Sequence, residues 1–174
     1  MDKLLTIKSD EIEEFSLQGT ITKGKVVEMY DGDTCKIVLI YKNELMKFNC
    51  RLMHIDTPEM KPSRNKPNRE EEIKNAIKCR NRLLQLTSSC EITLEDNKTK
   101  LQIKKLLDKN NKIITIKCHE FDKYGRLLVE LLNEENDTAT FNDILIEEGY
   151  ILVYIVCKVM AKRYEGGTKD VFVY

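Results

Sequence analysis

The strongest constraint on the fold is a run of three strand-like segments in the first third of the chain. Short apolar-rich segments with the pattern of β-strands occur at "ITKGKVVEMY" (21–30), "TCKIVLIY" (34–41) and "MKFNCRLMHI" (46–55). A D-G turn separates the first two segments, and "KNEL" separates the second from the third. Strands joined by turns this short pair as antiparallel neighbours, so the sequence predicts a three-stranded meander.

Helix and strand patterns alternate in the rest of the chain. Residues 69–86, "REEEIKNAIKCRNRLLQL", carry one apolar stripe and three glutamates in the first turn, which predicts a helix. We expect strands in "CEITLED" (90–96), "KIITIKCHEF" (112–121) and "RLLVELL" (126–132), and a helix, a candidate insertion, in "KTKLQIKKLLDKNN" (98–111). A short helix is expected in residues 138–150, with Thr140 and Asp143 as its capping box and Gly149 as its stop.

The chain length and composition indicate one globular domain. The 174 residues suffice for a sizeable core, and the proportions of 41% hydrophobic and 33% charged residues are those of an ordered domain. We interpret residues 1–20 as an appended arm, with a short helix in residues 9–15, and residues 21–174 as the domain. A monomer is expected.

Charge and hydropathy restrict the possible partners and location. The formal net charge is zero, so a polyanion must be bound by a local basic patch. One such patch is predicted in the proline-containing loop after residue 59, at Lys61, Arg64, Lys66 and Arg69. No signal-peptide pattern is found at the N-terminus, and the apolar run at 150–157 is shorter than the roughly 20 residues of a membrane span. An intracellular location without a membrane partner is therefore expected.

The six cysteines are best interpreted as reduced thiols in the core. Most of them lie among apolar residues of expected strands or helices. The alternative is a zinc site that would use Cys50, His54, Cys118 and His119. The chain has no C-x-x-C pair to support zinc, so the thiol interpretation is favoured.

Two acidic turns suggest a site for a hard cation. Asp31 and Asp33 flank Gly32, and residues two apart share one face of a strand, so their charges repel unless a positive group lies between them. Asp56 and Glu59 add two carboxylates at another turn. An all-oxygen set suits Ca²⁺ or Mg²⁺, although a solvated acidic hairpin would have the same local sequence.

Two arginines add the chemistry of phosphate binding. Arg51 and Arg126 lie within or beside expected strands, where a guanidinium needs a bidentate partner. Two arginines next to a cation site could clamp a phosphate. Simple pairing of both arginines with nearby surface carboxylates is the alternative.

The ordered motifs "DGDT", "RLMHIDTPE", "FDKYGR" and "FNDILIEEGY" together resemble the staphylococcal nuclease family. The resemblance covers residues 20–150, with insertions in the middle. It implies an α+β fold with a five-stranded OB-type β-barrel and packed helices. It also implies a calcium-dependent phosphodiesterase acting on DNA or RNA, with magnesium the less favoured ion. Family members usually act as endonucleases that leave 3′-phosphates.

The resemblance also assigns a role to individual residues. The metal ligands would be Asp33, Asp56 and the Thr57 carbonyl, with Asp31 as the acid behind them. Glu59 would position or activate water, and Arg51 and Arg126 would stabilise the transition state. Lys123 and Tyr124 would contact a nucleotide phosphate.

The sequence departs from the family pattern after Gly149. The family's base-stacking tyrosines have three candidate counterparts in "YILVYIVCKVMAKRY" (150–164), namely Tyr150, Tyr154 and Tyr164. Tyr164 is favoured because "AKRYEGGTK" resembles the family's tyrosine segment, displaced by an insertion, and a core position is expected for Tyr150 and Tyr154. Two other functions are considered, namely a non-catalytic nuclease-like module that binds nucleic acid and an ordinary OB-fold binder of single strands. The retained carboxylates and arginines favour the enzyme.

Overall fold

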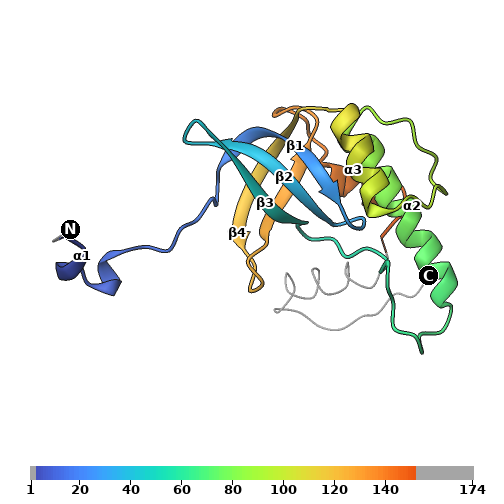
Figure 1. The fold of residues 1–174 in the computed structure, drawn as a ribbon, viewed down its shortest axis with the longest axis horizontal. Coiled ribbons are helices and arrows are strands. Elements are labelled where there is room, and N and C mark those ends of the chain that lie inside the picture. The colour runs from blue at the N-terminus through green and yellow to red at the C-terminus, as the bar shows by residue number, and fades with distance from the viewer. Residues whose placement is uncertain (1–2, 152–174) are drawn as a thin grey trace, which may run out of the picture.

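A computed structural model describes residues 3–151 as a closed five-stranded barrel flanked by helices (Figure 1). Its strands are β1 (Ile21–Met29), β2 (Thr34–Tyr41), β3 (Glu44–Leu52), β4 (Ile114–Phe121) and β5 (Leu127–Leu132). They follow the order β1-β2-β3-β5-β4, and β4 closes the barrel against β1. The predicted α+β class and the five-stranded barrel are confirmed.

The meander β1-β2-β3 has the predicted antiparallel pairing, and its register sets the position of Arg51. The two-residue turn between β2 and β3 has positive φ at Lys42 and Asn43, which is typical of tight hairpins. From this turn the pairing runs without interruption to the opposite end, where Thr34 lies across from Arg51. The adjoining end of β3 pairs in parallel with β5, with Cys50 opposite Leu127. The segments around Arg51 and Arg126 are therefore neighbours in the sheet.

Within the described part of the chain, three helices cover the barrel. They are α2 (Arg69–Thr87), α3 (Lys100–Lys109) and α4 (Phe141–Glu147), and all three lie where the sequence predicts helices. Figure 1 shows α2 and α3 together on one side of the barrel. Helix α3 packs on β1 through its buried Ile103 and Leu107, and α4 has the predicted capping box of Thr140 and Asp143.

The strand predicted at residues 90–96 is not present, and this prediction is wrong. Two buried side chains of α2 take over the hydrogen bonding of this segment. The Asn81 amide donates to the carbonyls of Thr93, Leu94 and Asp96 at 2.9–3.0 Å, and Arg80 donates to the carbonyls of Asp96 and Lys98. Because helix side chains satisfy these carbonyls, the segment needs no sheet partner.

The N-terminal segment differs from the helix expected at residues 9–15. It forms two short elements instead, α1 (Lys3–Thr6) and the 3-10 helix η1 (Ser9–Glu11). The segment extends away from the barrel in Figure 1 and returns to it at Phe15 and Leu17. Phe15 packs against the rings of Tyr41 and Phe121, and Leu17 is buried. The proposed domain boundary after residue 20 stays a prediction.

Five cysteines occupy the predicted core positions as free thiols. Cys35, Cys50, Cys79, Cys90 and Cys118 are all buried, and burial raises the pKa of Cys50 and Cys79 to about 12. Cys157 lies outside the described residues. His54 is exposed while Cys50 and Cys118 are buried, and the four residues of the zinc alternative do not form a metal-binding group. The zinc interpretation is therefore wrong.

Candidate active site

The turn between β1 and β2 is organised by the Asp31 carboxylate. Its Oδ1 accepts hydrogen bonds from the backbone N–H of Thr34 at 2.8 Å and of Asp33 at 3.3 Å. A side chain that bonds to the backbone two and three residues ahead fixes the turn locally. Asp31 therefore shapes the loop that carries Asp33.

Gly32 is required by packing rather than by backbone conformation. A Cβ at this position would collide with Cys79 Sγ of α2 and lie 3.0 Å from Thr57 Cγ2. Its φ is not in the left-handed region, unlike that of Gly125 at 76°. The D-G-D sequence thus brings the turn into direct contact with α2 and with the segment around Thr57.

Asp33 is the centre of the site and is only 2% exposed. Its Oδ1 accepts from an Arg51 guanidinium nitrogen at 2.6 Å and from the Thr34 hydroxyl at 2.9 Å. Its Oδ2 accepts from the backbone N–H and the hydroxyl of Thr57, both at 2.9 Å. A buried carboxylate is costly unless it is paired and hydrogen-bonded, and Asp33 has both kinds of partner.

Arg51 links Asp33 to Asp56. One guanidinium nitrogen lies 2.6 Å from Asp33 Oδ1, and the other lies 2.7 Å from Asp56 Oδ1. Burial alone would lower the pKa of Arg51, but the two carboxylates outweigh burial and raise it. One cation therefore joins two acids that are 23 residues apart in the sequence.

The cluster has a surplus of negative charge. Burial, followed by the charge of Asp33, raises the pKa of Asp31 to about 7. Among residues 3–151, the guanidinium of Arg51 is the one that Asp31, Asp33 and Asp56 share. This is the electrostatic setting in which a bound cation is favourable.

The donor chemistry of this cluster fits a hard cation. Within residues 3–151, no group of three or more His, Cys, Asp or Glu side chains is arranged to hold a metal ion. A site here would need backbone oxygen, and the Thr57 carbonyl is next to Asp56 in the chain. Two carboxylates and a carbonyl are all-oxygen ligands, which suit Ca²⁺ or Mg²⁺.

Arg126 is held at the end of the turn between β4 and β5. Its guanidinium lies 2.7 Å from the Asp122 carboxylate, which also accepts from the backbone N–H groups of Tyr124 and Arg126 at 2.9 Å. Burial would raise the pKa of Asp122, but these hydrogen bonds and the charge of Arg126 lower it. Asp122 of the "DKYG" turn thus holds the Arg126 side chain in place.

Three further predicted residues, Glu59, Lys123 and Tyr124, lie at the surface. Tyr124 is 72% exposed, and Lys123 Nζ and the Arg126 guanidinium lie 5.0 and 5.4 Å from its ring centroid. Glu59 is exposed, and its backbone N–H donates to Glu72 of α2 at 3.4 Å. Tyr164 lies outside the described residues.

The structure therefore unites one part of the predicted set. Asp31, Asp33, Arg51, Asp56 and Thr57 are joined by hydrogen bonds, ion pairs or direct electrostatic contact. Within residues 3–151, no hydrogen bond or ion pair joins Glu59, Lys123, Tyr124 or Arg126 to that cluster. Thr34 was not predicted as a site residue, although it is part of the D-G-D-T motif, and its hydroxyl binds Asp33.

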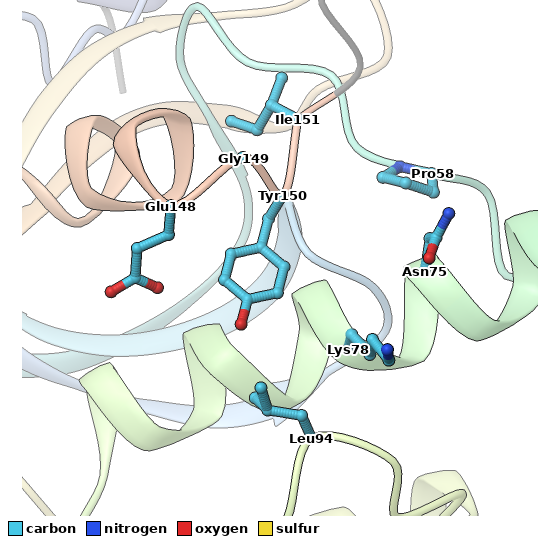
Figure 2. Close-up of a pocket in the computed structure, with 8 residues that line it drawn as sticks. All are labelled: Pro58, Asn75, Lys78, Leu94, Glu148, Gly149, Tyr150 and Ile151. Carbon is cyan, nitrogen blue, oxygen red and sulfur yellow. The ribbon is translucent and has the colours of Figure 1, made fainter.

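A pocket of about 330 Å³ lies next to the site, between α2 and the end of α4. Pro58 is on its rim, and Figure 2 shows Tyr150 pointing from the end of α4 toward α2, where Asn75 and Lys78 lie. Tyr150 is partly buried and packs against the core, as predicted. Ile151, the last described residue, also lines this pocket.

A family model for staphylococcal nuclease homologues matches residues 49–169. The chain belongs to this family. The matched range includes Arg51, Asp56, Thr57, Glu59 and Arg126. Asp31 and Asp33 precede the matched range, and their place in the site rests on the motif and on the bonds that join Asp33 to Arg51 and Thr57.

The staphylococcal nuclease-like domain also has a relative in an archaeon. The uncharacterized protein MJ1439 of Methanocaldococcus jannaschii is 35% identical over 136 residues. The aligned part is 76% of this chain and 59% of the relative, so the chain spans under two thirds of the relative's length.

Two further features of this nuclease-like domain concern its surroundings. No helix within residues 3–151 is long and apolar enough to cross a membrane. In the predicted basic loop, Lys66 pairs with Glu72 at 2.6 Å and Arg69 donates to the Pro62 carbonyl at 3.3 Å. Lys61 and Arg64 are exposed and make no hydrogen bond or ion pair with another described residue.

Proposed function

We propose that this protein is a calcium-dependent nuclease that hydrolyses phosphodiester bonds within DNA or RNA and leaves 3′-phosphates. The observation that carries the proposal is the pairing of Arg51 with two carboxylates, at 2.6 Å to Asp33 and 2.7 Å to Asp56. This pairing concentrates the oxygen ligands for a cation and an arginine for phosphate at one point. Membership of the nuclease family supports the same reaction class.

Asp33, Asp56 and the Thr57 carbonyl would hold the cation. When bound, Ca²⁺ would supply a positive charge that polarises a phosphoryl oxygen and makes bound water more acidic. The Thr34 and Thr57 hydroxyls donate to Asp33 and leave it little freedom to rotate, which would keep it oriented for this task. Asp31 supports Asp33 by fixing the turn beneath it.

The two arginines would stabilise charge on the phosphoryl oxygens. A guanidinium presents several donors in one plane and matches phosphate geometry. The pairing of Arg51 with Asp33 and of Arg126 with Asp122 holds both groups before a substrate arrives. Hydrogen-bond donors that are already in position for the transition state are usually the largest contribution to the rate of such reactions.

Glu59 would act on the attacking water, either as its general base or by aligning it. Its position three residues after Asp56 keeps it near the cluster, and its exposure leaves it accessible to water. Lys123 and Tyr124 would contact a neighbouring phosphate, and Tyr164 would stack on a base. A monomer would suffice, since one chain supplies all of these groups.

A second candidate function is a nucleic-acid-binding module without catalysis. Family membership alone is compatible with it, because a fold can lose its chemistry. The retained Asp33, Asp56, Glu59, Arg51 and Arg126 favour the enzyme, since binding alone does not require this set.

The test is digestion of plasmid DNA, single-stranded DNA and single-stranded RNA with Ca²⁺, with Mg²⁺ and with EDTA. We expect cleavage with Ca²⁺, weaker cleavage with Mg²⁺ and none with EDTA, with 3′-phosphates on the products. Binding without cleavage in all three conditions would support the non-catalytic module instead. Full activity in EDTA would contradict the role assigned to the cation.

A further inference from the structure

A second cavity, of about 180 Å³, adjoins the candidate active site on the α3 side of the barrel. Its lining includes Met29, Tyr30, Lys36, Lys100 and Arg126. We propose that this cavity is a nucleotide subsite that binds, on a single strand, the next nucleotide along from the two that the scissile phosphodiester joins. This inference rests on the proposed function for the location of the scissile bond, but its binding chemistry can be tested separately.

The cavity is continuous with the catalytic groups. Arg126, one of the proposed phosphate-binding arginines, is part of its lining, and so is Thr34. The Thr34 hydroxyl donates to Asp33 Oδ1 at 2.9 Å. A strand bound at the site therefore reaches this cavity with its adjacent nucleotide.

The rim of the cavity carries an excess positive charge. Lys36 of β2 and Lys100 of α3 both approach the same carboxylate, Glu28 Oε2, at 3.3 and 3.2 Å. One glutamate neutralises only one of the two ammonium groups. The lysine side chains are 36% and 64% exposed, and surface pairs of this kind contribute little to stability. A phosphate can therefore replace Glu28 as the partner of one lysine.

The cavity also offers an apolar floor and an aromatic ring. Met29 and Cys35 are buried beneath it at 2% and 3% exposure, whereas Tyr30 is 44% exposed. Exposed aromatic rings beside cationic side chains are the usual platforms for single-stranded nucleic acid. The cavity, at about 180 Å³, is below the roughly 300 Å³ at which pockets for drug-sized ligands begin, so it has room for part of one nucleotide and not for several.

Helix α3 holds Lys100 in place. Lys100 is its first residue, directly after the N-cap Thr99 and within the Thr99–Gln102 capping box. Ile103 and Leu107 anchor the helix in the core at 0% and 2% exposure. The helix predicted from the sequence in residues 98–111 thus contributes one charged wall of the subsite.

The test uses three full-length variants with matched charge changes. Lys36→Met with Lys100→Met removes both lysines, and Glu28→Gln removes the competing carboxylate. Lys104→Met with Lys105→Met removes the same charge from exposed positions of α3 and serves as the control. Thermal unfolding checks that every variant is folded.

Affinity for labelled single-stranded DNA and RNA is measured by fluorescence anisotropy in EDTA over a range of salt concentrations. We expect the Lys36/Lys100 variant to bind about tenfold more weakly, with a salt slope shallower by about 0.7 for each phosphate that the variant no longer neutralises. Glu28→Gln should bind more tightly than wild type, and the control should bind like wild type. An affinity and slope for the Lys36/Lys100 variant equal to those of the control would overturn the subsite.

Cleavage of a dinucleotide and of a long single strand separates the two proposals. If the wild type cleaves both, the Lys36/Lys100 variant should have a raised KM for the long strand only, and equal KM values would overturn the subsite while hydrolysis stands. If the wild type cleaves neither but the binding differences are observed, the subsite stands and the proposed hydrolysis is wrong. Absence of oligonucleotide binding by the wild type would overturn the subsite.

Discussion

Two halves of the candidate site differ in how they are held. The inner half, Asp31, Asp33, Arg51 and Thr57, is partly or fully buried and joined by hydrogen bonds of 2.6–3.3 Å. The outer half, Glu59, Lys123 and Tyr124, is exposed, and its side chains make no hydrogen bond with the inner half within residues 3–151.

This difference indicates which residues serve the fold as well as the chemistry. Buried charges destabilise a protein unless they are paired, so removing one member of the inner half leaves others without partners. The exposed side chains of the outer half do not support one another in this way. We therefore expect substitutions in the inner half to lower both stability and turnover, and substitutions in the outer half to lower turnover alone.

The largest effect is expected for Asp33→Ala. It removes the acceptor of four hydrogen bonds and leaves Arg51 without its buried partner. The free energy of unfolding should fall by about 3–5 kcal/mol, and cleavage should be abolished. Urea unfolding measures the first effect, with Asp108→Ala on the exposed face of α3 as a control. A midpoint equal to that of the control would show that the inner half is not structural.

Glu59→Gln should lower turnover by about 10²-fold or more, because a group acting on the attacking water is removed. The unfolding midpoint should not change, since the exposed Glu59 side chain has no bonded partner among residues 3–151. Steady-state cleavage and thermal unfolding of the same preparation check both parts. Glu70→Gln, another exposed glutamate nearby, is the control. A large drop in the stability of Glu59→Gln would show that the outer half also supports the fold.

Thr57→Val is expected to have an intermediate effect. It keeps the backbone carbonyl and the branched shape but removes the hydroxyl that donates to Asp33 at 2.9 Å. The buried Asp33 then lacks one donor, which should cost about 1–3 kcal/mol of unfolding free energy. Thr57→Ser retains the hydroxyl and should recover most of this stability. Equal destabilisation of both variants would show that packing, rather than the hydrogen bond, matters here.

The smallest effect concerns the basic loop. All four residues, Lys61, Arg64, Lys66 and Arg69, were predicted to attract substrate, but Lys66 and Arg69 already have partners within the protein. Changing Lys61 and Arg64 to Ser should weaken substrate binding a few-fold and make its salt dependence shallower. Lys66→Ser should change binding less. The rate of cleavage after binding should be unaltered in both variants. An unchanged salt slope for the Lys61/Arg64 variant would show that the loop does not contribute to substrate binding.

The sequence predicts the elements whose patterns arise from local chemistry. The strand-like segments 21–30 and 34–41 form strands, and the capping box of Thr140 and Asp143 begins a helix. The error at residues 90–96 has a tertiary cause, because Asn81 and Arg80 bind the carbonyls of an apparently strand-like segment. No pattern within residues 90–96 indicates that partners on α2 replace a sheet.

Within the site, the sequence predicts contacts between residues of the same short motif. The D-G-D-T motif predicts a turn with carboxylates, but it does not reveal that Cys79 of α2 packs against Gly32. The convergence of Lys36 and Lys100 on Glu28 could not be inferred, because it depends on how α3 docks on β1. Contacts between elements distant in sequence are therefore what the structure adds.

The central claim, that Asp33 and Asp56 hold a catalytic calcium ion, is tested most directly by a calcium titration of the cleavage rate for wild type and Asp56→Asn. Asp56 has a half-exposed side chain bonded to Arg51, so the variant should fold normally. We expect no wild-type cleavage in EDTA and a much higher calcium concentration for half-maximal cleavage by Asp56→Asn, with similar unfolding temperatures in EDTA. Calcium-independent cleavage by the wild type, or the same calcium midpoint for both proteins, would contradict the claim.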